Sequence, residues 1–414
     1  MELERIAVIG AGITGLSIAL ALQTAGLPTL LLAPEEERPP ASWGNAGHIA
    51  IEQVAPLASF AALASAPCRL TIAGGALALP LNGLSASIPF GVRMMAASLP
   101  SVFQAGKARL KALMKDVMPA WRELVDTIGR PDLLIESGHL IVWMEPAAAQ
   151  RGIAAWRATD TGTARFRPAN SDELARVGSL VHRAPAGGLA FENTAQVLDP
   201  GAVLAALASA FTAAGGTRRI CAVGRLALQG GKAQAFDADG QPVEAARVVV
   251  AAGVRSGDLL RPLGLKVPII AERGYHIQSA DHDWPNDLPP LVFEERSMIV
   301  TRFSSGVRAA SFVELTRHDA PPIERRWQAL ERHVSELGLP VRGPFTHWHG
   351  SRPTLPDYLP AIGKAPQADN LFYAFGHQHL GLTLAPITAR YVAAMLRDGA
   401  PSPALEAFSL RRFH

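Results

Sequence analysis

The feature that most constrains this sequence is a glycine-rich turn near its start. Residues 6–9 form a short apolar run, typical of a buried parallel strand. The next six residues read GAGITG, a G-x-G-x-x-G motif that opens an apolar helix expected to end near Gly26. In such a turn the first glycine permits the bend, the second lets the backbone approach a pyrophosphate, and the third lets helix and strand pack closely. Because the helix then points unpaired N–H groups at the phosphates, the segment predicts a dinucleotide-binding unit.

The second strand of this unit departs from the usual pattern. A strand expected at 29–32 should end in an acidic residue that holds the ribose hydroxyls, but Ala33 stands there. Glu35 follows two residues later, and then Glu36 and Glu37. Three interpretations stay open: Glu35 replaces the acid from the loop, the ribose relies on backbone and water contacts, or all three glutamates are solvated surface residues.

Composition narrows the class of protein. The chain has 414 residues, of which 49% are hydrophobic and 18% charged, so two or three domains can each bury a substantial core. The 39 basic residues are interspersed with 36 acidic ones without a Lys/Arg run, which argues against nucleic-acid binding. Cys68 and Cys221 lie far apart and form neither a disulfide framework nor a metal-binding spacing, as expected in a reducing compartment.

The apolar stretches do not predict a membrane-spanning protein. The run at 6–22 lacks a positive segment before it and is punctuated by glycines, so we do not expect a signal sequence. No stretch reaches about 18 uninterrupted apolar residues, so no transmembrane helix is predicted. The least charged region, about 55–100, is broken by prolines, glycines and arginines and predicts loops and short elements. We therefore expect a cytoplasmic protein, with peripheral contact to the inner face of the membrane as the alternative.

The rest of the chain alternates between two kinds of pattern. The expected elements are a Pro/Gly-rich loop at 39–56, a helix near 108–128, a strand at 139–143, a helix at 198–216, a strand near 218–223, a buried strand at 246–257, antiparallel hairpins at 291–315, a strand at 370–376 and a helix from about residue 381. This order predicts a discontinuous nucleotide-binding domain (1–55, 190–265 and 341–414). It is interleaved with a substrate domain (56–189 and 266–340) built on an antiparallel sheet.

Seven segments together resemble one superfamily. They are the turn at 10–15, SWGNAGHIA at 42–50, QVLDPG at 196–201, VVVAAG at 248–253, ERGYHI at 272–277, RPTLPDYLPAIG at 352–363 and GHQHLGLTLAP at 376–386. The chain resembles the FAD-dependent D-amino-acid oxidase and dehydrogenase superfamily, and most of all the bacterial D-amino-acid dehydrogenases and their D-hydroxyproline-oxidising relatives. The resemblance implies a Rossmann-like FAD-binding domain of the glutathione-reductase type, an α/β unit interleaved with an α+β substrate domain.

The resemblance also implies which residues surround the cofactor. They are Gly10, Gly12, Ile13, Thr14 and Gly15 at the pyrophosphate; Ala33 or Glu35 at the ribose; Ser42, Gly44, Asn45, Ala46, Gly47, His48 and Ile49 around the flavin ring; Val223 at the adenine; Ala252 and Gly253 at the phosphate and ribose; and Arg352, Gly376, His377, Leu380, Gly381, Leu382 and Thr383 on the C-terminal side. The helix start at Gly381 would offer N–H groups to the flavin's pyrimidine edge, which gains negative charge on reduction. Relatives that attach FAD covalently use a cysteine in the C-terminal third, and no cysteine follows Cys221, so we expect non-covalent FAD.

The candidate substrate residues are Arg352, Tyr275, His276, His48, His379 and Arg302. Arg352 matches an arginine that grips the substrate carboxylate in glycine-oxidase-like relatives, and a guanidinium fork suits that group; the alternative is a structural arginine. Tyr275 and His276 match pocket-wall positions or are packed core residues. Arg302 is a weaker candidate, because an alternating strand turns half its residues outward.

Two His-x-His pairs raise the question of a metal. His347 with His349, and His377 with His379, would each face one side of a strand, and metal sites need converging imidazoles with further ligands. The resemblance places the second pair beside the flavin, and the first leads into Arg352, so we predict no metal. Relatives of the glycine-oxidase type carry arginine and asparagine where this chain has His379 and Leu380, which leaves the amine-holding group open.

These observations predict an enzyme that dehydrogenates a D-amino acid, with D-proline and cis-4-hydroxy-D-proline as candidates, by hydride transfer from Cα to flavin N5. The partner is a small-molecule amino acid, and the electron acceptor is open between oxygen, a quinone and a protein. His48, His276, His377 and His379 are the groups considered for deprotonating the amine. The alternatives are an oxidase of glycine, sarcosine or opine-type secondary amines, the flavin subunit of a multi-protein amine dehydrogenase, and a metal-dependent hydrolase.

Overall fold

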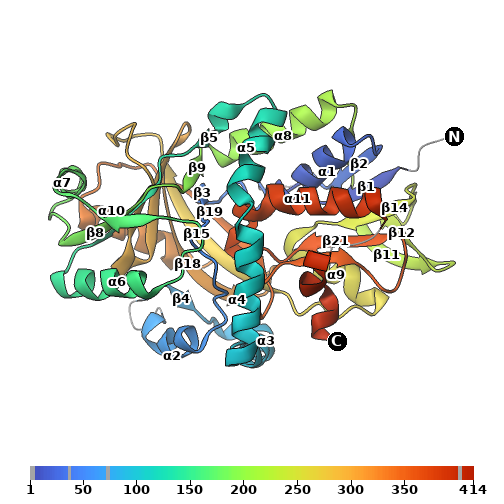
Figure 1. Cartoon of the computed structure of the whole chain (residues 1–414), viewed down its shortest axis with the longest axis horizontal. Helices are drawn as coiled ribbons and strands as arrows, with labels where there is room; N and C mark the ends of the chain where they lie inside the picture. The colour runs from blue at the N-terminus through green and yellow to red at the C-terminus, as the bar shows by residue number, and fades with distance from the viewer. Residues whose placement is uncertain (1–4, 36–38, 71–74, 400–402) are drawn as a thin grey trace.

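The computed structural model describes residues 5–35, 39–70, 75–399 and 403–414. Glu36 and Glu37, two of the glutamates considered for the ribose, lie outside the described residues. Two large sheets organise the chain, one on each side of the view in Figure 1. Helix α4 (Pro100–Met114) runs between the two halves in that view, and α3 (Leu84–Ala97) lies at its lower end.

The first sheet carries the glycine turn. Its strand order is β10-β2-β1-β14-β21-β20, with bounds β1 (Ile6–Ile9), β2 (Thr29–Ala33), β10 (Thr217–Ile220), β14 (Arg247–Val250), β20 (Ala361–Lys364) and β21 (Leu371–Phe375). All neighbours are parallel except β20 with β21. Alternate residues enter opposite layers, so Val8 packs on the helical side while Ile9 packs on the other.

Both faces of this parallel sheet are covered, which explains its nearly continuous apolar strands. The helical layer consists of α1 (Ile13–Thr24), α8 (Pro200–Ala213) and α11 (Gly381–Asp398). The opposite layer is a three-stranded antiparallel sheet of β11 (Val223–Gln229), β12 (Lys232–Asp237) and β13 (Pro242–Val243). Short helix α9 (Ser256–Leu260) follows β14 on the same side.

The second large sheet is mainly antiparallel. Its order is β19-β15-β18-β17-β16-β6-β8-β7, with β4 beside β18, and its bounds are β4 (Leu77–Ala78), β6 (His139–Trp143), β7 (Phe166–Pro168), β8 (Gly187–Phe191), β15 (Ile270–Ser279), β16 (Leu291–Phe293), β17 (Met298–Phe303), β18 (Gly306–Thr316) and β19 (Thr346–Thr354). The pairs β16–β6 and β18–β4 are parallel. Helices α6 (Pro146–Ala158) and α7 (Ser171–Gly178) lie near the β6–β8 end, as Figure 1 shows.

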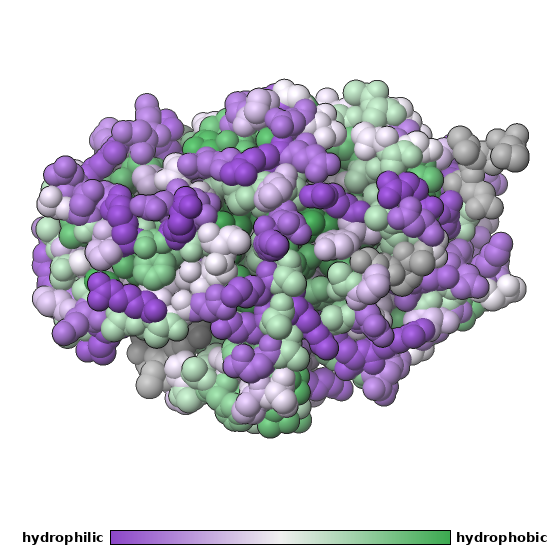
Figure 2. All heavy atoms as spheres, viewed as in Figure 1, coloured by the Kyte–Doolittle hydropathy of each residue, from purple (hydrophilic) through white to green (hydrophobic). Residues whose placement is uncertain are grey.

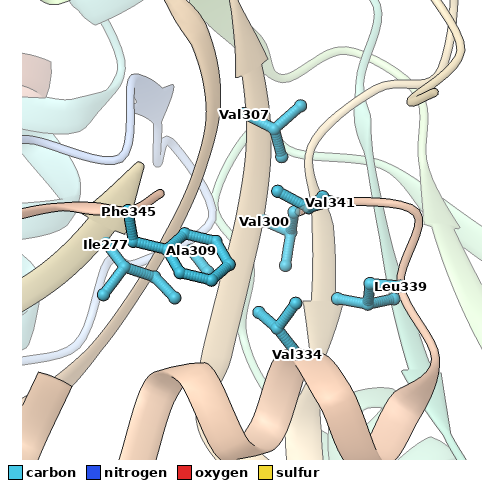
Figure 3. Close-up of a pocket in the computed structure, with 8 residues that line it drawn as sticks. All are labelled: Ile277, Val300, Val307, Ala309, Val334, Leu339, Val341 and Phe345. Atoms are coloured by element: carbon cyan, nitrogen blue, oxygen red, sulfur yellow. The ribbon is translucent and has the colours of Figure 1, made fainter. Parts of the chain in front are cut away.

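Helix α10 (Arg325–Leu337) covers one face of this sheet. Figure 3 shows apolar side chains from β15, β17, β18, α10 and the segment after it pointing toward one another, and the space between them leaves no room for a water molecule. This side is therefore packed core. Because strand residues alternate between faces, Tyr275 and Ile277 join this core while His276 lies on the opposite face, toward the 42–49 loop.

A small third sheet links the two halves. It has the order β3-β9-β5, with bounds β3 (His48–Ile49), β5 (Leu134–Ile135) and β9 (Ala195–Val197). Of the remaining helices, α2 (Phe60–Arg69) precedes α3, and α5 (Val117–Thr127) follows α4 and contacts α11. Trp121 of α5 donates from its indole Nε1 to the carbonyl of Thr383 at 3.1 Å, which ties this helical segment to the start of α11.

The structure corrects three sequence predictions. The helix expected near 108–128 is two helices, because Pro119 lacks the N–H that would bond back to Lys115. The strand expected at 218–223 ends at Ile220, and Val223 begins another strand in a different sheet. The strand expected at 246–257 ends at Val250 and passes into short helices.

A fourth correction concerns the region expected to hold only loops and short elements, about 55–100. It contains α2 and the 14-residue helix α3, each with a proline inside. Phe90 of α3 packs with Ala58, Ile270 and Tyr358, and this burial holds the helix in spite of Pro89. None of the helices in the described ranges is long and apolar enough to cross a bilayer. The domain bounds stated above stay a prediction.

Candidate active site

The glycine turn leaves no space for side chains at two positions. Gly10 has φ +113°, and a Cβ there would lie 2.4 Å from the carbonyl oxygen of Ala251. A Cβ on Gly15 would lie 1.8 Å from the carbonyl oxygen of Gly10. Gly12 is the extended N-cap residue of α1 and gives the helix no side-chain cap. The turn is therefore as tight as the motif predicts, and the start of α1 can face an anion.

The first residue of the 42–49 loop lies against the start of α1. The hydroxyl of Ser42 accepts a hydrogen bond from the N–H of Ile13 at 3.1 Å, so the structure places Ser42 beside the glycine turn rather than with Gly47 and His48. Its own O–H stays available to a phosphate oxygen. Thr14 follows in the first turn of α1.

The residues predicted to hold the ribose and adenine lie near the end of β2, where Ala33 closes the strand and its carbonyl accepts from the N–H of Cys221 at 2.8 Å. Val223 starts β11 just beyond, and Glu35 is exposed two residues after Ala33. Ala252 and Gly253 follow β14, whose neighbour Ala251 contacts the glycine turn. These positions lie at one edge of the parallel sheet, and the interpretations of Glu35 stay open.

Strands of the second sheet hold the middle of the 42–49 loop. The carbonyl of Ala46 accepts from the hydroxyl of Thr301 at 2.9 Å, and the N–H of Gly47 donates to Asn45 Oδ1 at 2.8 Å. Gly47 has φ +79°, and a Cβ there would lie 2.5 Å from the ring of Phe303. The second sheet therefore shapes this part of the loop.

Arg308 is a buried arginine that sequence reasoning missed. Its Nη1 donates to the carbonyls of Trp43 and Asn45 at 2.8 and 2.6 Å, and its Nε donates to Gln278 Oε1 at 2.9 Å. Burial lowers the pKa of Arg308 to about 10, and the side chain still carries its charge at neutral pH. The available signal was an arginine on the otherwise mostly apolar strand 306–316, where Glu314 is the other charged residue, since an arginine on a buried strand needs partners.

Gly44 lies against two aromatic side chains. Its carbonyl accepts from Nδ1 of the buried His276 at 3.1 Å, and a Cβ on Gly44 would lie 2.1 Å from the ring of Trp348. His276 stacks on Trp348 with ring centroids 5.0 Å apart. Burial holds the pKa of His276 well below its ordinary value, so this imidazole is neutral at physiological pH. It supports the loop as a hydrogen-bond donor.

The C-terminal candidates converge at the start of α11. Gly376 has φ +79°, and His377 Nε2 lies 3.0 Å from Thr388 Oγ1 inside the protein. The hydroxyl of Thr383 accepts from the N–H of Ala50 at 3.0 Å and so joins α11 to the end of the 42–49 loop. The N-cap of α11, Leu380, provides no side-chain cap. Leu380 and Leu382 bury their side chains, so only their backbones are available to a cofactor.

Arg352 is a residue of β19, and its guanidinium extends over the neighbouring strand β15. A Cβ on Gly274 would lie 2.2 Å from Arg352 Nη2, so the glycine in ERGYHI makes room for the guanidinium. Arg352 Nη1 donates to the carbonyl of Phe312 at 3.3 Å and lies 3.6 Å from Glu272 Oε1. The Arg352 side chain is 28% exposed, whereas Glu272 is 2% exposed. The guanidinium therefore keeps donors for a further carboxylate.

His379 lies near Arg352 and is hydrogen-bonded through Nε2 to Gln53 Oε1. Burial lowers the pKa of His379 to about 3, with a further contribution from the positive charge of Arg352. Burial alone lowers the pKa of His377 to about 4. Both imidazoles are therefore neutral at physiological pH and are weak bases.

His48 belongs to a buried cluster that includes two residues sequence reasoning missed. Its Nε2 lies 3.0 Å from Glu52 Oε1, and its ring lies 4.3 Å from that of His139. His139 Nδ1 in turn lies 2.8 Å from Thr194 Oγ1. Within the described part of the chain, neither His48 Nδ1 nor Glu52 Oε2 has a hydrogen-bond partner, although both atoms are buried. An unpaired buried acceptor is costly, which marks this cluster as a place where a ligand can complete the bonding.

The charge of this cluster follows from its contacts. Burial alone would raise the pKa of the Glu52 carboxyl, but the charge and hydrogen bond of His48, with a smaller contribution from His139, lower it on balance. Glu52 is therefore a buried anion at neutral pH. Burial lowers the pKa of His139 to about 3, so His139 is neutral there. The spacing of His48 and Glu52, four residues apart in the sequence, was the signal that could have found this pair.

The structure does not bring every candidate to the site. Tyr275 lies in the core under α10, where its hydroxyl donates to Glu314 Oε1 at 3.2 Å and accepts from the N–H of Ile323 at 3.1 Å. Arg302 neighbours Thr301 on β17 but turns to the other face, where its positive charge adds to the effect of burial in lowering the pKa of His282. His347 stacks on Trp327, so the two His-x-His pairs do not converge on one centre.

The residues present fit a dinucleotide cofactor. Two helices, α1 and α11, begin without a side-chain cap, Gly10 and Gly15 admit only glycine, and the 42–49 loop is fastened to α1 and to the second sheet. These features fit an oxidoreductase that binds a flavin-type dinucleotide and is built on a parallel and an antiparallel sheet. The chain belongs to the DAO family of FAD dependent oxidoreductases, whose pattern it matches over residues 5–395, and it is an FAD-dependent enzyme.

Curated relatives match over nearly the whole chain. A D-amino-acid oxidase of Bradyrhizobium diazoefficiens is 29% identical over 420 residues, which cover 100% of this chain and 99% of that protein. The D-amino acid dehydrogenase 2 of Pseudomonas aeruginosa is also 29% identical, over 414 residues and 96% of each chain. The general activity of the chain is therefore FAD-dependent oxidation of an amine or amino acid. The predicted family is confirmed.

Solved structures agree with the fold. An iminodiacetate oxidase from Chelativorans sp. BNC1 is 21% identical with a TM-score of 0.69, covering 98% of both chains. A glycine oxidase from Geobacillus kaustophilus is 19% identical with the same TM-score and coverage. The predicted fold class is confirmed.

Proposed function

We propose that this protein oxidises a D-amino acid, with D-proline and cis-4-hydroxy-D-proline as the first substrates to test. The D configuration is supported by two full-length relatives named D-amino-acid oxidase and D-amino acid dehydrogenase. When bound, FAD accepts the hydride that leaves the substrate Cα, and the carbon–nitrogen bond becomes an imine. The chain's own residues bind the substrate, orient its Cα–H bond and hold a proton.

The observation that carries this proposal is the position of Arg352 beside His379 at the start of α11. Its side chain is partly exposed and uses one donor on the carbonyl of Phe312. A substrate carboxylate can take two of the remaining donors as a bidentate pair. Oε1 of Glu272 lies 3.6 Å from Nη1 of Arg352 and offsets part of its positive charge. The guanidinium is therefore held in place without being fully neutralised.

The amine end of the substrate faces the His48 and Glu52 pair in this proposal. If Nε2–H of His48 donates to the Glu52 carboxylate, Nδ1 carries the free lone pair, and Nδ1 is the atom without a partner in the described chain. A substrate ammonium group supplies the missing donor and passes its proton to Nδ1, which leaves a neutral amine. Burial lowers the pKa of His276, His377 and His379, so these imidazoles are weak bases and are not the acceptors we propose.

Two further groups complete the proposed site. The uncapped start of α11 offers its N–H groups and positive dipole end to the reduced cofactor. The chain has no cysteine after Cys221, in line with non-covalent FAD. The electron acceptor is oxygen, a quinone or a protein, and a test under air against an added dye separates the first from the others.

An oxidase of glycine-type or other secondary amines is the second candidate. A glycine oxidase of Pseudomonas aeruginosa is 32% identical to this chain, although over only 160 residues and 37% of its length. Turnover of a panel containing D-amino acids, D-proline, cis-4-hydroxy-D-proline, glycine, sarcosine and iminodiacetate separates the two proposals. Preference for sarcosine or iminodiacetate over every D-amino acid contradicts the first.

The carboxylate role is tested with Arg352→Ala and Arg352→Lys. Loss of the guanidinium should lower kcat/KM by more than 100-fold, which corresponds to about 3 kcal/mol or more of transition-state stabilisation. The lysine variant should recover part of this loss. Arg342→Ala is the matched control, because Arg342 is an exposed arginine paired with Asp281 and Asp283. Unchanged kcat/KM in Arg352→Ala refutes the assignment.

A further inference from the structure

Exposed hydrophobic residues are concentrated in one segment. Of the eleven large hydrophobic residues that are exposed in the described part of the chain, nine lie between residues 57 and 102. They are Leu57, Phe60, Leu79, Leu81, Ile88, Val92, Met95, Leu99 and Val102, and we call them the 57–102 surface. Single exposed hydrophobics are ordinary on a protein surface, but a concentration of this kind marks an interaction site.

Helix α3 is apolar on two faces. Ile88, Val92 and Met95 are 60%, 56% and 52% exposed, and their spacing places them on one side of the helix. Phe90 is 3% exposed and packs into the core with Ala58, so it faces the protein. Packing explains the inner face only. The outer face needs another apolar environment, because a helix that is hydrophobic on both sides is otherwise buried.

The charge of this segment is one-sided. No Asp or Glu occurs between Glu52 and Asp116, whereas six Lys or Arg residues do. Lys107 and Lys111 pair with Asp160, but Arg93 on α3 and Arg109 on α4 are exposed, and the described residues provide no carboxylate partner for them. An apolar surface with a cationic rim and no acidic residue matches an anionic lipid surface.

Figure 2 shows hydrophobic residues gathered at the lower end of the molecule, where Figure 1 places α3. We propose that the 57–102 surface docks on bilayers containing anionic phospholipid, with Ile88, Val92 and Met95 inserted between the headgroups. The contact is peripheral, since the described helices include none that can span a bilayer. Arg93 and Arg109 lie where they can reach lipid phosphates from its edge.

A second copy of the chain is the main competing occupant, and the charges disfavour it. In a symmetric dimer the same patch meets itself, so Arg93 and Arg109 would face like charges with no acidic residue of the segment to offset them. Lipid phosphates offset these charges directly. The observations therefore favour the bilayer over self-association.

The surface also lies close to the candidate site along the chain. Leu57 follows Glu52 by five residues, which span at most about 18 Å when fully extended. A bilayer bound here would bring lipid-soluble molecules near the site. This consequence rests on the proposed function, whereas the docking itself does not.

The test is flotation of the FAD-loaded protein with vesicles, which requires no turnover. We expect binding to phosphatidylcholine vesicles that contain phosphatidylglycerol, and weaker binding both to pure phosphatidylcholine and at about 1 M salt, where the Debye length falls to about 3 Å. The triple variant Ile88→Ser, Val92→Ser and Met95→Ser should lower partitioning by about 100-fold or more. The double variant Ile220→Ser and Leu228→Ser removes the other two exposed hydrophobics and should bind like the wild type.

Retained FAD and dye-linked turnover show that each variant is folded. Equal binding of the triple variant and the wild type overturns the proposal, as does equal binding to both kinds of vesicle or to neither. The proposal is also overturned if the wild type is a dimer in solution and the triple variant is a monomer, because a second copy of the chain then covers the surface. Since vesicle binding and substrate turnover are measured separately, failure of one leaves the other intact.

Discussion

The Nε2 atom of His48 lies 3.0 Å from Oε1 of Glu52, and this contact joins the end of the 42–49 loop to a buried carboxylate. Ala50, between them, bonds through its N–H to Thr383 at the start of α11. The pair therefore lies where the loop and the C-terminal helix meet. Its two unpartnered atoms, His48 Nδ1 and Glu52 Oε2, distinguish it from a satisfied core ion pair in the described structure.

Replacing His48 by Asn tests the proton role. The variant lacks the acceptor, so its substrate must arrive with a neutral amine, and kcat/KM at neutral pH should fall by about 100-fold. The loss should shrink by about tenfold per pH unit as the pH rises toward the range in which the substrate ammonium group titrates. Anaerobic rates of flavin reduction across pH measure both effects. A variant profile parallel to that of the wild type contradicts the role.

The matched control for this experiment is His318→Asn. His318 is partly exposed and lies 3.9 Å from Asp258, away from the loop and from α11. Its replacement should leave both the rate and the pH profile unchanged. A similar loss in both variants means that the effect on His48→Asn is not specific to proton transfer.

Replacing Gly44 by Ala tests how tightly the loop is packed. A Cβ at this position would lie 2.1 Å from the Trp348 ring, so the loop must shift, and we expect FAD affinity to fall about tenfold or more. Adding Trp348→Leu makes space and should restore part of the affinity, which a double-mutant cycle would measure. Gly91→Ala is the control, because a Cβ there meets nothing within 4 Å. Additive losses in the double variant contradict the proposed clash.

Replacing Arg308 by Met tests whether the second sheet positions the 42–49 loop. The carbonyls of Trp43 and Asn45 would lose their donor inside the protein, and we expect the free energy of unfolding to fall by about 3 kcal/mol with weaker FAD binding. Urea unfolding and FAD titration measure the two losses. Arg225→Met is the control, because Arg225 is exposed over Phe236 and should change stability by less than about 0.5 kcal/mol. Unchanged FAD affinity in Arg308→Met contradicts the positioning role.

The glycine turn and the C-terminal motif could be predicted from the sequence because local geometry determines them. Gly10 and Gly15 have neighbours that exclude any side chain, and the start of α11 lies where the motif at 376–386 places it. Interruptions inside helices were harder to predict. Pro89 suggested a loop, yet long-range packing of Phe90 keeps α3 helical, and a local pattern does not contain that packing.

The candidate site was only partly predictable for the same reason. His48 stood in a recognisable motif and Glu52 follows it by four residues, but its neighbour His139 meets it through the tertiary fold. Tyr275 and His276 are adjacent and looked equivalent, although strand alternation sends Tyr275 into the core and His276 to the loop. Which face of a strand points toward the site depends on the neighbouring sheet.

Buried neutral histidines should make the protein sensitive to mild acid. Burial lowers the pKa of His377 to about 4, while an unfolded chain binds this proton near the ordinary histidine pKa of about 6.5. Between those values the unfolded state holds the extra proton, so the free energy of unfolding rises with pH and is lost as the pH falls, by about 1.4 kcal/mol per unit for this group. His377→Gln should remove that share of the slope between about pH 4 and 6.5. Above pH 7 the two proteins should show the same pH dependence in urea unfolding with excess FAD. Equal slopes in the acid range would mean that His377 is protonated as readily in the folded protein as in the unfolded chain.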